Sequence, residues 1–204
     1  MARRPDEEPD LKLAEELIFR GRGLALERFD RADTLAGRTP DFRVLLGDTL
    51  KAFCEVKSPR DDWLDDQIEA ASPGQIAGGA RSDPTFNRIA RHVKNAASQF
   101  DAVNGDHAVP NILVFVNHAV ASGFGDVHET LTGMFHSESG ERFATMRRIS
   151  DGWIGEARKK IDLYIWIDRR TSSVQGYLFN EIRSHHVKTL CDLLGLDPNE
   201  IQPD

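Results

Sequence analysis

The sequence predicts an α/β fold in which helices flank a central mixed β-sheet, and three stretches carry that prediction. Residues 41–57 alternate apolar and polar side chains on either side of a Gly47-Asp48 turn signal, as a β-hairpin does. Asn111–Val116 is continuously apolar, which is typical of a central strand covered on both faces. Between them, Asn87–Val103 repeats apolar residues at helical spacing, so we expect a long helix beside the sheet.

The N-terminal part is expected to supply a helix and a strand ahead of the hairpin. Leu11–Phe19 gathers its apolar side chains on one side, which predicts a short helix that ends at the glycines following it. Leu24–Phe29 predicts a strand that leads through the connection 31–39 into the hairpin. The hairpin strands are expected at 41–46 and 50–57.

A long connection, Ser58–Pro84, follows the hairpin and is rich in Gly, Ser, Pro and Asp. Trp63 and Leu64 could anchor a short helix within it. Connections of this length are usually functional or disordered. Both alternatives stay open, a flap that faces a substrate and a surface segment without order. Ser82 or Asp83 with Pro84 offers a start signal for the helix that comes next.

The C-terminal half continues the alternation of helices and strands. We expect helices at Asp126–Phe135 and Glu141–Ile149, a hairpin from Ile161–Asp168 to Gly176–Asn180, and a last helix through Val187–Leu194. The core order is then helix, three strands, helix and strand (αβββαβ), completed by a C-terminal hairpin and helix. We expect one domain over residues 1–204.

Composition narrows the class of protein. The net charge of −7 argues against a general nucleic-acid coat protein, although residues 142–160 carry six basic residues against two acidic ones. No run reaches the roughly 18 apolar residues of a membrane span, and the N-terminus is too acidic for a signal peptide. Cys54 and Cys191 stand alone in apolar surroundings, as buried thiols do in a reducing compartment. We therefore expect a cytoplasmic protein without a membrane partner.

The hairpin carries the residues that point to chemistry. Glu55 and Lys57 are two residues apart on one strand and must project from the same face. Asp41 begins the facing strand. Carboxylates that converge are costly to hold together without a counter-ion, and Mg²⁺ prefers such oxygen ligands. A surface ion cluster is the alternative reading of the three residues.

The spacing Pro40-Asp41-x13-Glu55-x-Lys57 resembles the signature of the PD-(D/E)xK nuclease superfamily, which has the restriction-endonuclease-like fold. The resemblance implies that Asp41, Glu55 and the main-chain carbonyl of Val56 hold Mg²⁺ or Mn²⁺. It implies that Lys57 activates the attacking water. As an exposed lysine, Lys57 would contribute little to stability.

The superfamily also implies residues from two helices. A carboxylate of the first helix often lies near the metal, here Glu16 or Glu15, and helical angles do not choose between them. The helix after the hairpin often adds a polar residue, here Gln99 or Lys94, and Arg88 and Lys94 are candidates for binding the substrate. Gln99 belongs to a polar stripe along that helix, formed by Arg88, His92, Asn95 and Gln99. A solvated helix face is the alternative.

The leading functional hypothesis is a Mg²⁺-dependent endonuclease that hydrolyses nucleic acid, with DNA favoured over RNA. A catalytically inactive, nuclease-like binding module in a larger assembly is the alternative, and a hydrolase or interaction protein of unrelated fold is a weaker one. Other catalytic patterns are incomplete, since His128-Glu129 has no second histidine four residues on and no G-x-S-x-G sequence occurs. A homodimer or a larger complex remains open.

Parity sets a geometric condition on this site. Residues directly opposite in an antiparallel pair point to the same face, and the numbers of Asp41 and Glu55 sum to 96. A regular ladder with that sum needs a loop with an odd number of residues, and Gly47–Thr49 is the simplest. A two-residue loop would turn Asp41 away from Glu55 unless a β-bulge restored the register.

Overall fold

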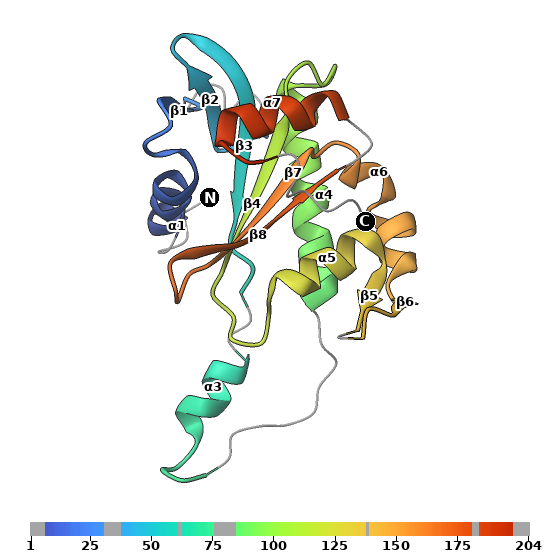
Figure 1. Ribbon diagram of the computed structural model, residues 1–204. Helices are drawn as coiled ribbons and strands as arrows, with labels where there is room; N and C mark the ends of the chain where they lie inside the picture. Colours follow the sequence, from blue (N-terminus) through green and yellow to red (C-terminus); the bar gives the residue numbers. More distant parts are fainter. Residues whose placement is uncertain are drawn as a thin grey trace.

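The computed structural model describes residues 7–30, 38–60, 63–75, 85–137, 139–180 and 184–197. Its centre is a six-stranded sheet in the order β1-β2-β3-β4-β7-β8 (Figure 1). The β3–β4 and β4–β7 pairs are parallel, and the other three pairs are antiparallel. The strands of this sheet are β1 (Leu24–Arg28), β2 (Phe42–Leu46), β3 (Thr49–Lys57), β4 (Asn111–Asn117), β7 (Leu163–Asp168) and β8 (Ser173–Phe179).

Helices cover both faces of the sheet. Figure 1 shows α1 on one face and α4 with α5 on the other. The helical segments are α1 (Glu7–Ala14) continued by the π-helical turn η1 (Glu15–Phe19), α3 (Trp63–Ala70), α4 (Thr85–Val103), α5 (Phe124–Thr132), the π-helical turn η2 (Arg148–Trp153), α6 (Gly155–Arg158) and α7 (Ser184–Leu194). The described part of the chain contains no helix with the length and apolar character that a membrane crossing needs.

Most predicted elements are confirmed. The expected mixed sheet contains β2, β3 and β4 at the predicted places, and α1 with η1 and α4 correspond to the two predicted flanking helices. The strand expected after the first helix is β1, and the C-terminal hairpin and helix are β7–β8 and α7. Within Ser58–Pro84, α3 forms a short helix that Figure 1 shows standing away from the sheet. The start signal at 82–84 lies outside the described residues.

The prediction fails between residues 126 and 149. The helix expected to reach Phe135 ends at Thr132, because Gly133 adopts a left-handed conformation (φ 74°) and its N–H closes the last turn on Glu129 O. The expected basic helix Glu141–Ile149 is absent from the described chain. Its first part is strand β6 (Arg142–Ala144), which pairs with β5 (Met134–His136). The backbone N–H groups of residues 145 and 146 then bond to Gly133 O and fix the hairpin base.

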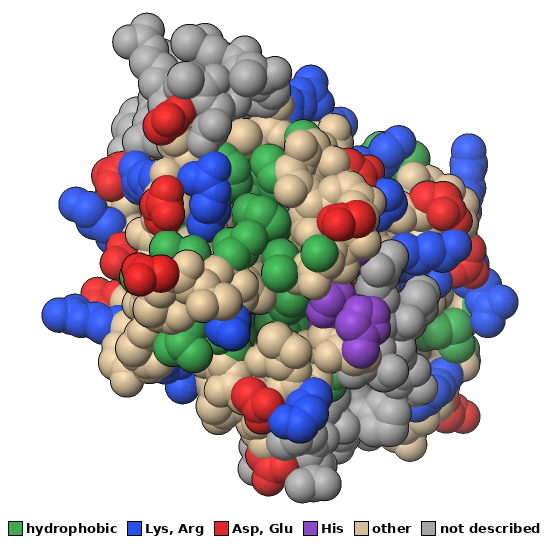
Figure 2. All heavy atoms as spheres, turned by 90° about the horizontal axis from the view of Figure 1, so that it is seen from above, with side chains coloured by type: hydrophobic (Ala, Val, Ile, Leu, Met, Phe, Trp, Pro, Cys, Tyr) green, Lys and Arg blue, Asp and Glu red, His purple; other side chains and the backbone are tan. Residues whose placement is uncertain are grey.

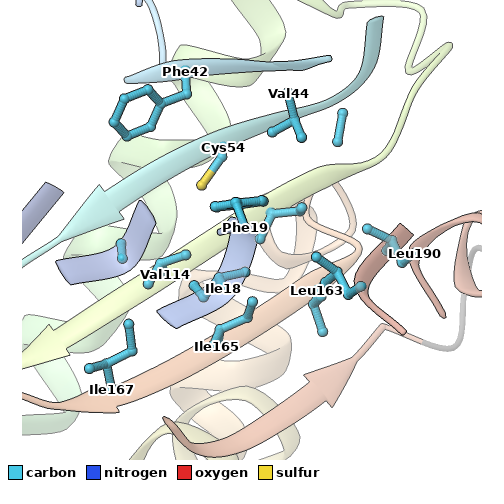
Figure 3. Close-up of a cluster of buried hydrophobic side chains, with 14 of the residues drawn as sticks. Ile18, Phe19, Phe42, Val44, Cys54, Val114, Leu163, Ile165, Ile167 and Leu190 are labelled. Atoms are coloured by element: carbon cyan, nitrogen blue, oxygen red, sulfur yellow. The ribbon is translucent and has the colours of Figure 1, made fainter. Parts of the chain in front are cut away.

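Two apolar cores lie on the two faces of the sheet. All seven residues of β4 are buried, which confirms the prediction of a strand covered on both sides. Val114 packs into the core that contains Ile18 and Phe19 of η1 and Leu190 of α7 (Figure 3). Phe115, the next residue, packs on the opposite face against α4. Successive residues of β4 therefore bury both faces of the sheet next to β3.

The β2–β3 hairpin has a two-residue loop and a β-bulge. Thr49 pairs with Leu46, so the loop consists of Gly47 and Asp48 alone, and the predicted three-residue loop is wrong. The register shifts beyond Leu45, where Lys51 is the extra residue, and Phe42 pairs with Cys54. The residue numbers of paired residues therefore add up to 95 beside the turn and to 96 at the far end of the hairpin. The bulge restores the register that places Asp41 opposite Glu55.

Candidate active site

Asp41 and Glu55 meet at the end of the hairpin remote from its turn. Asp41 immediately precedes β2, and its Oδ2 accepts a hydrogen bond of 2.8 Å from the backbone N–H of Val56. The side chain of Glu55 is only 2% exposed. The two carboxyl groups lie close enough that the charge of Asp41 raises the pKa of Glu55. The strand geometry thus brings together the two acids that the sequence predicted as partners.

Lys57 and Gln99 complete this group. Lys57 Nζ forms an ion pair with Glu55 Oε1 and donates a hydrogen bond of 2.9 Å to Gln99 Oε1. Gln99, on α4, donates through Nε2 to Thr39 O over 2.8 Å, which fixes the orientation of its amide. Lys57 is 18% exposed and paired. The expectation of an exposed lysine is therefore wrong, and its small influence on stability stays a prediction.

Burial and crowding change the charge of the two acids. Burial, followed by the proximity of Asp41, raises the pKa of Glu55 to about 8, although Lys57 opposes the rise. Burial also raises the pKa of Asp41, against the hydrogen bond from Val56. At neutral pH the metal-free pair therefore retains a proton. A cation between the carboxyl groups would favour their ionised forms.

These groups line a pocket of about 350 Å³. His92, Asn95 and Gln99 line it from α4, so three members of the predicted polar stripe face the site. The fourth member, Arg88, and the proposed substrate ligand Lys94 are not among the residues that line it. Lys94 is exposed, and its Nζ lies 5.8 Å from the ring centroid of Trp153. The pocket lining comprises Glu7, Asp10, Asp41, Glu55, Val56, Lys57, Ser58, Arg60, His92, Asn95 and Gln99.

The carboxylates that α1 brings to the pocket are Glu7 and Asp10. The predicted Glu16 is exposed, pairs with Arg20 over 3.1 Å and does not line the pocket, and Glu15 is also exposed and outside the lining. The helix begins at Glu7, four residues earlier than predicted, and Asp10 is buried beside Leu11 and Ala14. Helical spacing counted from Glu7 would have placed Asp10 with the apolar side.

Asp10 holds a group of hydrogen-bond donors at the pocket rim. Its Oδ2 accepts hydrogen bonds from Ser58 Oγ and from His118 Nε2, the latter at 2.8 Å. Arg60 lies 3.4 Å from the other ring nitrogen of His118, and because arginine only donates, His118 must carry its proton on Nε2. Arg169 Nε stands 3.5 Å from Asp10 Oδ1. One side of the pocket is therefore acidic and the rim beside it is cationic.

The pocket contains buried acceptors that have no hydrogen-bond partner. Among the described residues five buried side-chain atoms have no hydrogen-bond partner, and two of them, Glu55 Oε2 and Asp10 Oδ1, belong to this pocket. An unpaired buried acceptor costs about 1–3 kcal/mol. Glu55 Oε2 is therefore an acceptor that a bound cation or water would satisfy.

A second buried polar cluster lies at the other end of β4. His107 Nε2 donates to Asp162 Oδ2 over 2.6 Å, and His186 of α7 donates to His107 O over 3.2 Å. The two imidazole rings stack with centroids 5.1 Å apart and planes 21° from parallel. The nitrogen lone pairs of nearly parallel rings do not converge on one point. In this arrangement the cluster, although its ligand atoms lie within 4.8 Å of one another, is a hydrogen-bonded staple.

Comparison with known proteins adds no relative. No family model matches the chain, and neither a curated protein nor a solved structure matches it. The functional argument therefore depends on the geometry and electrostatics of the pocket.

Proposed function

We propose that the chain is a divalent-metal-dependent nuclease that hydrolyses phosphodiester bonds in nucleic acid, with DNA as the favoured substrate. One observation supports the proposal most. Asp41 and Glu55 converge with Lys57 inside one pocket, buried enough that the pKa of Glu55 rises to about 8. Strongly perturbed acids in a cleft are characteristic of catalytic sites. The order of α1, β1, β2, β3, α4 and β4 also agrees with a restriction-endonuclease-like core.

The donor set of the pocket fits Mg²⁺ or Mn²⁺. Both ions prefer oxygen ligands, which Asp41, Glu55 and the main-chain carbonyl of Val56 would supply. The unpartnered Oε2 of Glu55 gives such an ion a buried acceptor to satisfy. When bound, the ion polarises the scissile phosphate and stabilises the leaving oxygen.

The other residues of the pocket prepare the reaction. Lys57 Nζ has three N–H donors, and Glu55 and Gln99 engage two of them. The third is available to hold a water molecule and to favour its deprotonated form. Gln99 keeps the amine in place because Thr39 O fixes its own amide. Arg60 at the rim would donate a hydrogen bond to a phosphate oxygen of the substrate.

Cleavage of a panel of single-stranded, duplex and branched DNA and RNA tests the proposal. We expect cleavage with Mg²⁺ or Mn²⁺ and none with excess chelator. Lys57→Ala and Asp41→Asn should each lower the rate by about 100-fold or more, the usual effect of removing a group that stabilises the transition state. Glu16→Gln is the matched control, because Glu16 is an exposed acid outside the pocket, and it should cleave normally.

Melting curves must accompany the rates, because Lys57 pairs with a buried acid. They are best recorded near pH 6, where Glu55 is protonated and needs no ion pair. Wild-type activity in folded Lys57→Ala would remove Lys57 from the mechanism. A protein that binds nucleic acid but cleaves none of the panel with any divalent metal would favour the inactive binding module.

A further inference from the structure

A small hairpin outside α5 presents two aromatic side chains to solvent. Phe135 of β5 and Phe143 of β6 are directly opposite in the ladder, 45% and 48% exposed, with ring centroids 6.5 Å apart. Figure 1 shows this hairpin beyond α5, away from the six-stranded sheet. Trp153, at the end of the following turn η2, is 40% exposed. These three large apolar side chains are exposed to water and do not serve the core. Exposed apolar groups that lie together often mark a binding site.

Unpaired positive charge accompanies these rings. Of the six basic residues in 142–160, Arg158, Lys159 and Lys160 form ion pairs with acidic side chains. The other three, Arg142, Arg147 and Arg148, are exposed, and no described acidic residue pairs with them. Lys94 adds a cation over the ring of Trp153. In a chain with a net charge of −7, this concentration of arginines without an acidic partner among the described residues is a local exception.

We propose that this aromatic–arginine surface, formed by Phe135, Phe143, Arg147, Arg148 and Trp153, binds single-stranded nucleic acid. Arg142 is not part of it, because neighbouring residues of a strand project from opposite faces and Arg142 precedes Phe143 on β6. Unpaired bases can stack on exposed aromatic rings, and arginines interleaved with them contact the phosphates. Duplex bases are already stacked on one another and cannot use the rings. A second copy of the chain fits less well, because it would bring exposed arginines against exposed arginines.

The inference rests on the proposed nuclease function, since it names the form of the substrate, single-stranded over duplex. The surface is separate from the pocket, because none of its residues lines that pocket. Binding through it can therefore be measured apart from cleavage.

Fluorescence anisotropy with a labelled oligonucleotide, single-stranded or annealed, tests the surface. Lys57→Ala in chelator is used as the background so that no probe is cut. We expect the single strand to bind at least about 10-fold more tightly than the duplex. Phe143→Ala should weaken single-strand binding by about 10-fold, within the usual range for one lost stacking contact. Arg147→Gln with Arg148→Gln should lower the slope of log affinity against log salt by about 1.4, at roughly 0.7 per phosphate contact.

Two controls separate this surface from general effects. Leu46→Ala removes an apolar side chain of matching exposure (48%) from the β2–β3 hairpin, and Lys188→Gln removes an exposed cation from α7. Neither should change the affinity. Equal binding of duplex, unchanged affinity in Phe143→Ala, or a dimer that Phe143→Ala dissociates would each overturn the inference. Single-strand binding that depends on Phe143 in a protein that cuts nothing would refute the nuclease and leave the inference standing.

Discussion

Glu55 is the residue on which the candidate site depends most. It is buried beside a second acid, and its Oε2 has no hydrogen-bond partner. Fixing a carboxyl group in this way is unfavourable for the metal-free protein, because the ionised form is desolvated and repelled by Asp41. Proteins often accept such a penalty where a site must bind a cation.

The first prediction concerns the stability of the metal-free protein. The pKa of Glu55 is raised from 4.5 to about 8 on folding, so between those values the folded state binds more protons than the unfolded state. Stability from this group is full below pH 4.5 and is lost as the pH rises to about 8. Glu55→Gln, which cannot ionise, should therefore match wild type near pH 5 and melt several degrees higher at pH 8.5 in chelator.

Thermal melting at the two pH values measures the effect, with Glu16→Gln as the exposed-acid control. Adding Mg²⁺ should raise the melting temperature of wild type and leave Glu55→Gln almost unchanged, since only a ligand bound to the folded state stabilises it. A difference between variant and wild type that stays constant with pH would contradict the raised pKa.

At the scale of elements, the β2–β3 hairpin sets the site through one extra residue. Gly47 at φ 58° suits the first position of a two-residue turn, and Lys51 forms the bulge that brings Asp41 back opposite Glu55. Because of the bulge, the hairpin can have a two-residue turn and still place Asp41 opposite Glu55.

A pair of deletions tests this division of roles. Deleting Lys51 should leave a regular ladder with the same two-residue turn and the same pairing of Phe42 with Cys54, so activity should persist. Deleting Ala52 gives a hairpin of equal length but places Lys51 opposite Val44, in a position that is fully buried. A buried unpaired lysine is strongly unfavourable, and this variant should unfold or melt far lower. Loss of cleavage in a folded Lys51 deletion would show that the bulge itself shapes the site.

The elements also show which features the sequence could predict. Period-two alternation and the x13 spacing predicted that Asp41, Glu55 and Lys57 come together, and the family resemblance added Gln99 or Lys94 from the regular helix α4, of which Gln99 lines the pocket. Glu16 lies outside the pocket, whereas Glu7 and Asp10 line it. These two acids precede Leu11, where the apolar pattern predicts the helix start, so the pattern does not point to them. The bulge and the short strands β5 and β6 depend on backbone hydrogen bonds to distant residues such as Gly133, which no local pattern records.

Across the whole molecule, β4 links two buried polar clusters. Asn111 at its start donates through its backbone N–H to Asp162 Oδ2, and His118 just after its end donates to Asp10 in the pocket. The two ends are roughly 20 Å apart by strand rise. On the end of the molecule opposite α3, Figure 2 shows histidine side chains at the surface among intermingled acidic and basic groups. The hydrogen-bonded staple of His107, Asp162 and His186 joins α7 to the turn between α4 and β4.

The last prediction follows from the position of His186 in that staple. Burial, and to a lesser degree the neighbouring His185 and His107, lower the pKa of His186 below 6.5, while Asp162 and the hydrogen bond to His107 oppose the shift. The unfolded state then binds more protons below pH 6.5, so this group destabilises the fold as the pH falls through that value. In a Glu55→Gln background, which removes the opposing trend that Glu55 contributes, urea unfolding should show lower stability at pH 5.5 than at pH 7.5. Adding His186→Gln should flatten this dependence, whereas His128→Gln on α5 should preserve it. If His186→Gln and its parent differ in stability by the same amount at both pH values, His186 contributes only through packing. Its protonation would then not affect stability.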